Sequence, residues 1–168
     1  HFWQRRRAAH SEQLAARLHA ATKGQWCRSD RTDLREVLTH ASPPQVRALR
    51  YAYAMRFGHT LYATVRDELA GESDLEVLLL AIVQPGPTPG GSPAQQASAL
   101  GEALNASPLD KPAVIQCFST LSPPVLMEVA SLHLRASGES LAASLQRCAD
   151  GELANALLER LVWAREAA

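Results

Sequence analysis

The chain has 168 residues, 46% of them hydrophobic, with 17 basic and 17 acidic side chains and a formal net charge of zero. This apolar content excludes an intrinsically disordered chain, and the length allows one domain or two closely packed subdomains. The balanced charge excludes a general affinity for nucleic acid. Residues 1–84 nevertheless carry 12 Lys and Arg against 9 Asp and Glu, and residues 85–168 carry 5 against 8, a mild asymmetry able to orient the molecule near an anionic surface.

The three cysteines, Cys27, Cys117 and Cys148, lie far apart and form no C-x-x-C pair. This pattern is typical of reduced thiols in a cytosolic protein rather than of a disulfide framework. The longest apolar runs, such as residues 75–83, are too short to span a bilayer, and we recognise no signal peptide. We therefore expect a cytoplasmic protein whose contact with membranes is peripheral.

The chain opens on a basic cluster at residues 5–7, which we interpret as either a solvated arm or a lipid contact. Because no Met precedes it, we expect a piece of a longer chain. A first helix is predicted from Ser11 to about Gly24, because Leu14 and Leu18 share one face and glycine readily ends helices. Asp30 is predicted to cap a second helix.

Three further helices are predicted in this half of the chain. Ser42 is expected to cap a third helix, with prolines at its first positions, Gln45 reaching back to the cap, and Gly58 at its end. A fourth helix is predicted from about residue 60 until Gly71. A fifth starts near Ser73 and stops before residue 85, and its continuous apolar run implies burial on more than one side, at the centre of the unit.

A Pro- and Gly-rich segment, residues 85–93, is predicted to be an extended linker. From about residue 94 the same five helices recur, because many residues of the first half reappear 80 positions later. The pairs are Asp30/Asp110, Ser42/Ser122, Pro43/Pro123, Pro44/Pro124, Gly58/Gly138, Leu61/Leu141, Ala63/Ala143, Gly71/Gly151, Glu72/Glu152 and Leu78/Leu158. We therefore predict an all-α protein of two repeats, with domains at residues 1–84 and 94–168.

These features resemble the annexin repeat. The resemblance rests on Lys23-Gly24 before a loop, Ser29-Asp30 at the second helix, Phe57-Gly58 after the third, the sequence Glu-Leu-Ala-Gly at residues 68–71, and residues 74–83, which are very like the fifth helix of an annexin third repeat. It covers about residues 9–165, closely in the first unit and only in topology in the second. Annexins normally carry four repeats, so the chain resembles half a core, its third and fourth repeats.

The resemblance implies calcium as a cofactor. An annexin site takes backbone carbonyls from a K-G-x-G-T loop and a carboxylate 38 positions beyond the following Asp, which here is Glu68. Calcium prefers six to eight oxygen ligands, and one carboxylate leaves coordination open for a lipid phosphate. We therefore expect Gly24, Arg28 and Glu68 at a metal site in the first repeat only.

The sequence departs from the family pattern at this site. Arg28 stands where the second loop glycine is expected, and a residue other than glycine disfavours the left-handed turn that points the carbonyls at the ion. In the second unit residues 105–109 replace the loop, and the position 38 beyond Asp110 is Cys148. The alternative for Glu68 is a solvated or capping carboxylate near a helix end.

Trp26 lies in the loop that annexins press against the membrane. With Lys23 and Arg28 beside it, the loop is expected to contact anionic lipid, and the alternative is a tryptophan folded back over the repeat. The six histidines show no metal-ligand spacing and are expected at the surface or half-buried. No nucleophile elbow, P-loop or dinucleotide fingerprint occurs, and Cys148 lacks an orienting base, so no catalytic residue is predicted.

The sequence thus predicts a non-enzymatic annexin-like module for peripheral binding to anionic phospholipid membranes, assisted by calcium. The alternative is a degenerate fold that serves as a calcium-independent scaffold for protein–protein interaction within a larger protein. Half of a four-repeat core leaves apolar helix faces unpaired, which favours a homodimer or docking on another domain.

Overall fold

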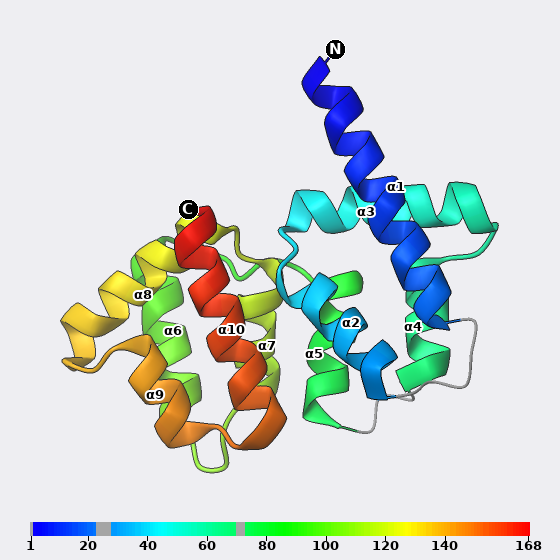
Figure 1. The fold of residues 1–168 in the computed structure, drawn as a ribbon. Coiled ribbons are helices and arrows are strands. Elements are labelled where there is room, and N and C mark those ends of the chain that lie inside the picture. Colours follow the sequence, from blue (N-terminus) through cyan, green and yellow to red (C-terminus); the bar gives the residue numbers. More distant parts are fainter. Residues whose placement is uncertain (1, 23–27, 70–72) are drawn as a thin grey trace. The chain divides into compact units, whose positions relative to one another are not determined.

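The computed structural model describes residues 2–22, 28–69 and 73–168, and within them ten helices and no strand occur (Figure 1). The all-α prediction is confirmed. The chain divides into two compact units, His1–Gln84 and Pro85–Ala168. Five of the described helices lie in each unit.

The first unit consists of α1 (Phe2–Thr22), α2 (Arg28–Thr39), α3 (Pro43–Phe57), α4 (Leu61–Leu69) and α5 (Asp74–Val83). α1 packs on α2 and α3, and α3 runs across the direction of α4 and α5 (Figure 1). α5 contacts α2, α3 and α4 and buries four of its ten residues, so its predicted central place is confirmed. The core includes Leu18, Leu34, Leu38, Leu49, Tyr53, Leu61, Val65, Leu78 and Ile82.

Two predicted helix starts are wrong. α1 begins at Phe2 rather than Ser11, because the Gln, Arg and Ala residues at positions 4–9 are good helix formers and nothing among them breaks a helix. Ser11 lies inside α1 and is buried, and residues 5–7 also belong to this helix. α2 begins at Arg28, so Asp30 lies within its first turn, a shift of the size that is common at helix ends.

The predicted caps of α3 and the predicted start of α5 near Ser73 are confirmed. The Ser42 hydroxyl accepts a hydrogen bond from the Gln45 backbone N–H, and the Gln45 side chain accepts one from the Ser42 N–H. Gly58 ends α3 with a φ of 74°, a left-handed conformation that glycine adopts without steric cost. Ser73 forms a second capping box with Glu76 at the start of α5.

The second unit consists of α6 (Pro93–Asn105), α7 (Lys111–Thr120), α8 (Pro123–Ser137), α9 (Leu141–Cys148) and α10 (Gly151–Ala167). α6 packs on α7 and α8, and α10 packs on α8 and α9. The core of this unit includes Leu100, Leu104, Val114, Phe118, Leu126, Val129, Leu141, Leu145 and Leu157.

The segment before α6 is not a free linker. It contains no helix at residues 85–92, as predicted, but two glutamines of the second unit hold its carbonyls. The Gln96 side-chain amide donates to the Pro89 carbonyl at 2.8 Å, and that of Gln116 donates to the Pro87 carbonyl at 2.7 Å. These bonds fix the segment to the second unit, and α6 already begins at Pro93.

The offset of 80 positions holds only in the middle of each repeat. α3 and α8 begin at Pro43 and Pro123, and α4 and α9 begin at Leu61 and Leu141. The fifth helices begin at Asp74 and Gly151, 77 positions apart. The two repeats therefore share an order of helices, and a gap is needed before the last one.

The fifth helices also bury different side chains. Val83 lies ten residues after the N-cap Ser73 of α5, and Arg160 lies ten residues after the N-cap Asp150 of α10. Both side chains are at most 1% exposed. The Arg160 Nε donates to the Phe118 carbonyl, and its guanidinium lies 5.0 Å from the centroid of the Trp163 ring. Burial lowers the pKa of Arg160 to about 10.

Candidate functional site

Glu68 is the described part of the predicted calcium site. It lies in the last turn of α4 and is half-buried, directly before the buried Leu69. The carboxylate of its neighbour Asp67 is exposed and lies 3.4 Å from the guanidinium of Arg66. Asp67 is therefore a solvated, paired acid, whereas Glu68 is half-buried. The last turn of a helix carries unpaired carbonyls and negative potential, and a carboxylate there attracts a cation.

The other predicted site residues fall mainly on undescribed positions. Lys23, Gly24 and Trp26 lie outside the described residues. Arg28 is the first residue of α2. The arrangement of the loop around Glu68 therefore stays a prediction.

The described residues supply one carboxylate ligand for a calcium site. No group of three or more His, Cys, Asp or Glu side chains is placed to hold a metal ion in the described ranges. Glu68 supplies one carboxylate next to a helix C-terminus, which suits a site completed by backbone carbonyls and water. The carbonyl donors of such a site would come from residues 23–29.

The matching helix end of the second unit is built differently. α9 ends at Arg147 and Cys148, and the Arg147 guanidinium donates to the Asn105 side-chain oxygen at 3.3 Å, at the end of α6. The same guanidinium donates to both carboxylate oxygens of Glu139, at 2.9 and 3.3 Å. A protein cation thus joins the end of α9 to the end of α6. The residue 80 positions before Arg147 is the exposed Asp67, and Glu68 matches Cys148.

The Arg147 network continues into the interior of the second unit. Glu139 Oε2 also accepts a hydrogen bond from the Ser144 hydroxyl at 2.9 Å, and that hydroxyl lies 2.8 Å from Nε2 of His133. The hydrogen bonds from Arg147 and Ser144 lower the pKa of Glu139, and the neighbouring charge of Arg147 adds to the effect. His133 is 4% exposed, so the prediction of surface or half-buried histidines is wrong at this position.

Two other histidines form a cluster that the sequence does not reveal. His19 of α1 and His59 after α3 both approach the hydroxyl of the buried Tyr53, at 3.5 Å each. The two histidines are 40 positions apart in sequence, so no short motif links them. Tyr53 and Phe57 are one helical turn apart on α3, and this spacing is the only local signal that an aromatic surface faces α1.

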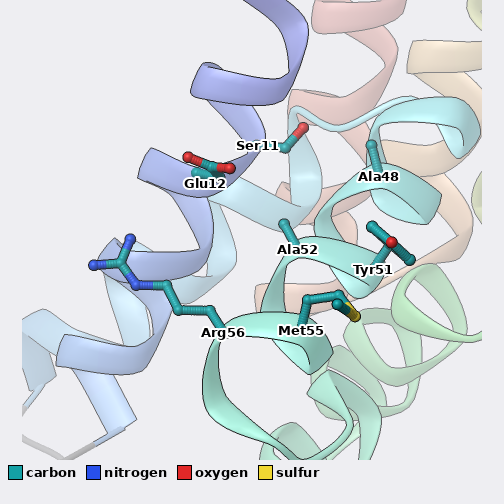
Figure 2. A pocket seen from close by; sticks show the side chains of 7 residues that line it. All are labelled: Ser11, Glu12, Ala48, Tyr51, Ala52, Met55 and Arg56. Carbon is teal, nitrogen blue, oxygen red and sulfur yellow. The ribbon is translucent and has the colours of Figure 1, made fainter. Parts of the chain in front are cut away.

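The first unit has an open groove between α1 and α3, with a volume of about 580 Å³. Figure 2 shows Ser11 and Glu12 coming from α1, and Ala48, Ala52 and three longer side chains coming from α3. Tyr51 and Met55 are each 70% exposed along it. The second unit has a groove of about 530 Å³ between α8, α9 and α10, beside the exposed Leu134 and Val162.

The described residues also include two free thiols. Cys117 is a buried free thiol whose pKa burial raises, and Cys148 is a half-buried free thiol. A raised pKa keeps a thiol in its unreactive protonated form. None of the described helices is both long and apolar enough to cross a membrane.

Comparison with protein families matches the annexin family model to residues 13–82, all within the first unit. Comparison by sequence with curated proteins gives no match. Among solved structures the chain is similar to annexin III, with 20% identity and a TM-score of 0.76 over 92% of this chain and 49% of that chain.

The chain is also similar to two giardins solved in calcium-bound form. Alpha-11 giardin has 24% identity and a TM-score of 0.71 over 90% of this chain and 51% of that chain. Alpha-14 giardin has 18% identity and a TM-score of 0.76 over 92% and 52%. These likenesses show the fold, and the chain spans about half the length of the solved structures that it matches.

Proposed function

We propose that this chain is a non-enzymatic module that binds anionic phospholipid membranes. It is an annexin-like repeat domain of two five-helix repeats and resembles half of a four-repeat core. The first repeat makes the contact, and calcium assists it. The observation that carries the proposal is the difference between the two repeats at the end of the fourth helix. In its last turn the first repeat has the carboxylate of Glu68, whereas the second has Cys148 at that position, preceded by the guanidinium of Arg147.

The family match supports the choice of the first repeat. The annexin family model matches residues 13–82 and none of the second unit. The first repeat also carries the positive half of the charge, with 12 basic against 9 acidic residues in positions 1–84. A net positive unit is drawn toward anionic headgroups by long-range electrostatics.

In the proposed contact, Glu68 holds a calcium ion together with backbone carbonyls of residues 23–29. The ion, when bound, accepts lipid phosphate oxygens in its open coordination positions. Lys23 and Arg28 attract anionic headgroups, and Trp26 enters the interfacial layer, which tryptophan prefers. The charge of Arg28 lowers the affinity for the cation, so calcium binding is weak until lipid adds its own negative charge.

The second repeat has a structural role in this proposal. Arg147 already bonds Glu139 and Asn105, so a cation is built into the protein at this end of the unit. A second positive ion there would be repelled by the guanidinium. We therefore assign calcium to the first repeat alone.

Co-sedimentation with phosphatidylserine–phosphatidylcholine vesicles tests the proposal. The wild-type chain is expected to pellet with calcium and to be released by a chelator. Glu68→Gln removes the ligand charge with little change in shape, so it is expected to lose calcium-dependent pelleting. Asp67→Asn is the matched control, because it removes the same charge from the exposed neighbour and leaves Glu68 in place.

If pelleting is unchanged by the chelator and by Glu68→Gln, lipid binding depends on Trp26 and the basic residues, and calcium has no part in it. If no protein pellets in either condition, the membrane proposal is wrong.

The second candidate is a calcium-independent scaffold that self-associates. It is favoured by the exposed Leu134 and Val162 beside the groove of the second unit. The chain spans about half the length of annexin III, so a second copy supplies an equal number of repeats. Light scattering that finds a dimer, together with absent pelleting, favours this candidate, and a strictly monomeric chain contradicts it.

A further inference from the structure

The His19–Tyr53–His59 cluster, defined by these three side chains, shares no residue with the proposed calcium site. Tyr53 is 0% exposed, and its hydroxyl lies 3.5 Å from His19 Nδ1 and 3.5 Å from His59 Nε2. Two ring nitrogens from separate parts of the chain thus converge on one oxygen. His19 is half-buried and His59 is exposed, so solvent reaches the cluster from the His59 side.

The hydrogen bonds of His59 fix which of its nitrogens has a lone pair. Its Nδ1 lies 2.8 Å from the Phe57 carbonyl, which only accepts, so Nδ1 carries a proton. In the neutral ring Nε2 then has the lone pair, and it is this nitrogen that approaches Tyr53. A carbonyl that holds the far nitrogen of an imidazole is the usual second contact of a metal-binding histidine.

The His19 ring is held in place by stacking. It lies parallel to Phe57, with ring centroids 3.6 Å apart and an angle of 11° between the planes. The ring edge that carries Nδ1 thereby faces Tyr53. The Tyr53 hydroxyl is held in turn by a hydrogen bond to Thr64 Oγ1 at 3.3 Å. Both imidazoles and the phenol are therefore oriented by contacts with the rest of the first unit.

From this geometry we propose that the His19–Tyr53–His59 cluster binds a divalent transition-metal ion of the Zn²⁺ class. His19 Nδ1 and His59 Nε2 are two ligands. The Tyr53 oxygen is the third, after its proton passes to solvent, and water takes the fourth position. Imidazole nitrogens suit Zn²⁺ and are poor ligands for calcium, which prefers oxygen.

The required movement is small. The centroids of the two histidine rings are 6.3 Å apart. With Zn–N bonds of about 2 Å at a tetrahedral ion, two ligating rings have centroids about 5 Å apart. Closing this gap needs an inward shift of about 1 Å, which falls to His59 because it is exposed and lies in the short connection between α3 and α4.

Isothermal titration of the full chain with zinc chloride tests the proposal. The wild type is expected to bind one Zn²⁺ with a micromolar Kd. His59→Ala and His19→Ala are each expected to weaken binding at least about tenfold, since even contacts that orient ligands matter by 10- to 100-fold. His40→Ala is the matched control, because His40 is exposed and its Nδ1 also lies 2.8 Å from a backbone carbonyl, that of Glu36.

A spectroscopic readout separates ligation from a loss of folding. Zn²⁺ is expected to produce the near-ultraviolet difference spectrum of an ionised tyrosine, and Tyr53→Phe is expected to abolish it while circular dichroism stays unchanged. The proposal is overturned if the wild type binds no Zn²⁺ at millimolar concentration, or if His40→Ala weakens binding as much as His59→Ala. It is also overturned if calcium displaces the zinc, since one site would then serve both ions.

Discussion

The two repeats have the same order of helices but end their fourth helix with opposite charges. The last turn of α4 carries Glu68, a half-buried acid, and the last turn of α9 carries Arg147, which already bonds Glu139 and Asn105. The same fold thus presents one end that attracts a cation and one end in which the protein supplies the cation. Repeats with a common fold need not share a function, because function depends on the particular side chains that the fold carries.

The fifth helices also differ in charge, because one buries an apolar side chain and the other a guanidinium. Val83 fills the core of the first unit, whereas Arg160 fills that of the second and donates to the Phe118 carbonyl. Arg147 and Arg160 each join elements of the second unit through side-chain or backbone oxygens. The second repeat therefore has guanidinium contacts in its interior and at the end of its fourth helix, where the first repeat has Val83 and the acids Asp67 and Glu68.

The largest expected effect is at Arg160. Arg160→Ala leaves a cavity and a buried carbonyl without its donor, and we expect a loss of about 3 kcal/mol in the free energy of unfolding. Arg160→Met keeps most of the volume and removes the cost of burying a charge, so we expect a loss of under about 1.5 kcal/mol. Urea denaturation of both variants measures the difference, and equal losses would mean that the guanidinium contacts themselves determine the stability.

The next effect separates the two fourth helices. Glu68→Gln is expected to weaken calcium-dependent vesicle binding by at least about tenfold, equivalent to about 1.4 kcal/mol, because the ion loses its one charged protein ligand. Cys148→Ala alters the matching position of the second repeat and is expected to leave binding unchanged. A calcium titration at fixed vesicle concentration measures both, and an equal effect of the two variants would contradict the assignment to the first repeat.

The third helices offer a smaller and purely structural contrast. Ser42 forms a capping box with Gln45, whereas Ser122 begins α8 without a side-chain hydrogen bond, and Val125, at the position of Gln45, has no polar side chain to reach back to the cap. We expect Ser42→Ala to cost about 1 kcal/mol of unfolding free energy and Ser122→Ala less than about 0.5 kcal/mol. Thermal unfolding of the pair checks this order, and the reverse order would show that the caps are not the cause.

The smallest effect is a pH dependence in the second unit. The folded pKa of Glu139 lies below its usual value of 4.5, so its contribution to stability is present above that pH and is lost as the pH falls through the folded pKa. Glu139→Gln is expected to be less stable than the wild type at pH 7 and to approach it as the pH falls below 4.5. Unfolding curves at several pH values measure this convergence, and a constant difference would contradict it.

Local signals in the sequence were sufficient for much of the fold. Ser42, Gly58 and Ser73 located the ends of α3 and α5, because a cap depends on residues only a few positions away. The start of α1 was missed, since Ser11 resembles a cap but lies inside a longer run of helix formers. The sequence does not reveal the change of offset before α10, because the pairs Gly71/Gly151 and Glu72/Glu152 keep the offset of 80 positions up to the start of that helix.

Contacts between distant residues were not predictable in this way. Three features of the structure join separate elements. They are the approach of His19 and His59 to one tyrosine, the hydrogen bonds from Gln96 and Gln116 to residues 85–92, and the bond from the buried Arg160 to α7. Such contacts depend on how helices pack, which a single sequence does not specify. The site residues Lys23, Gly24, Trp26, Arg28 and Glu68 remain predictions drawn from the annexin resemblance.

The most direct test of the account is the number of calcium ions bound per chain in the presence of anionic vesicles. Equilibrium binding with radioactive calcium is expected to give one ion for the wild type and none for Glu68→Gln. Two ions per wild-type chain, or one ion that persists in Glu68→Gln, would contradict the division of roles between the two repeats.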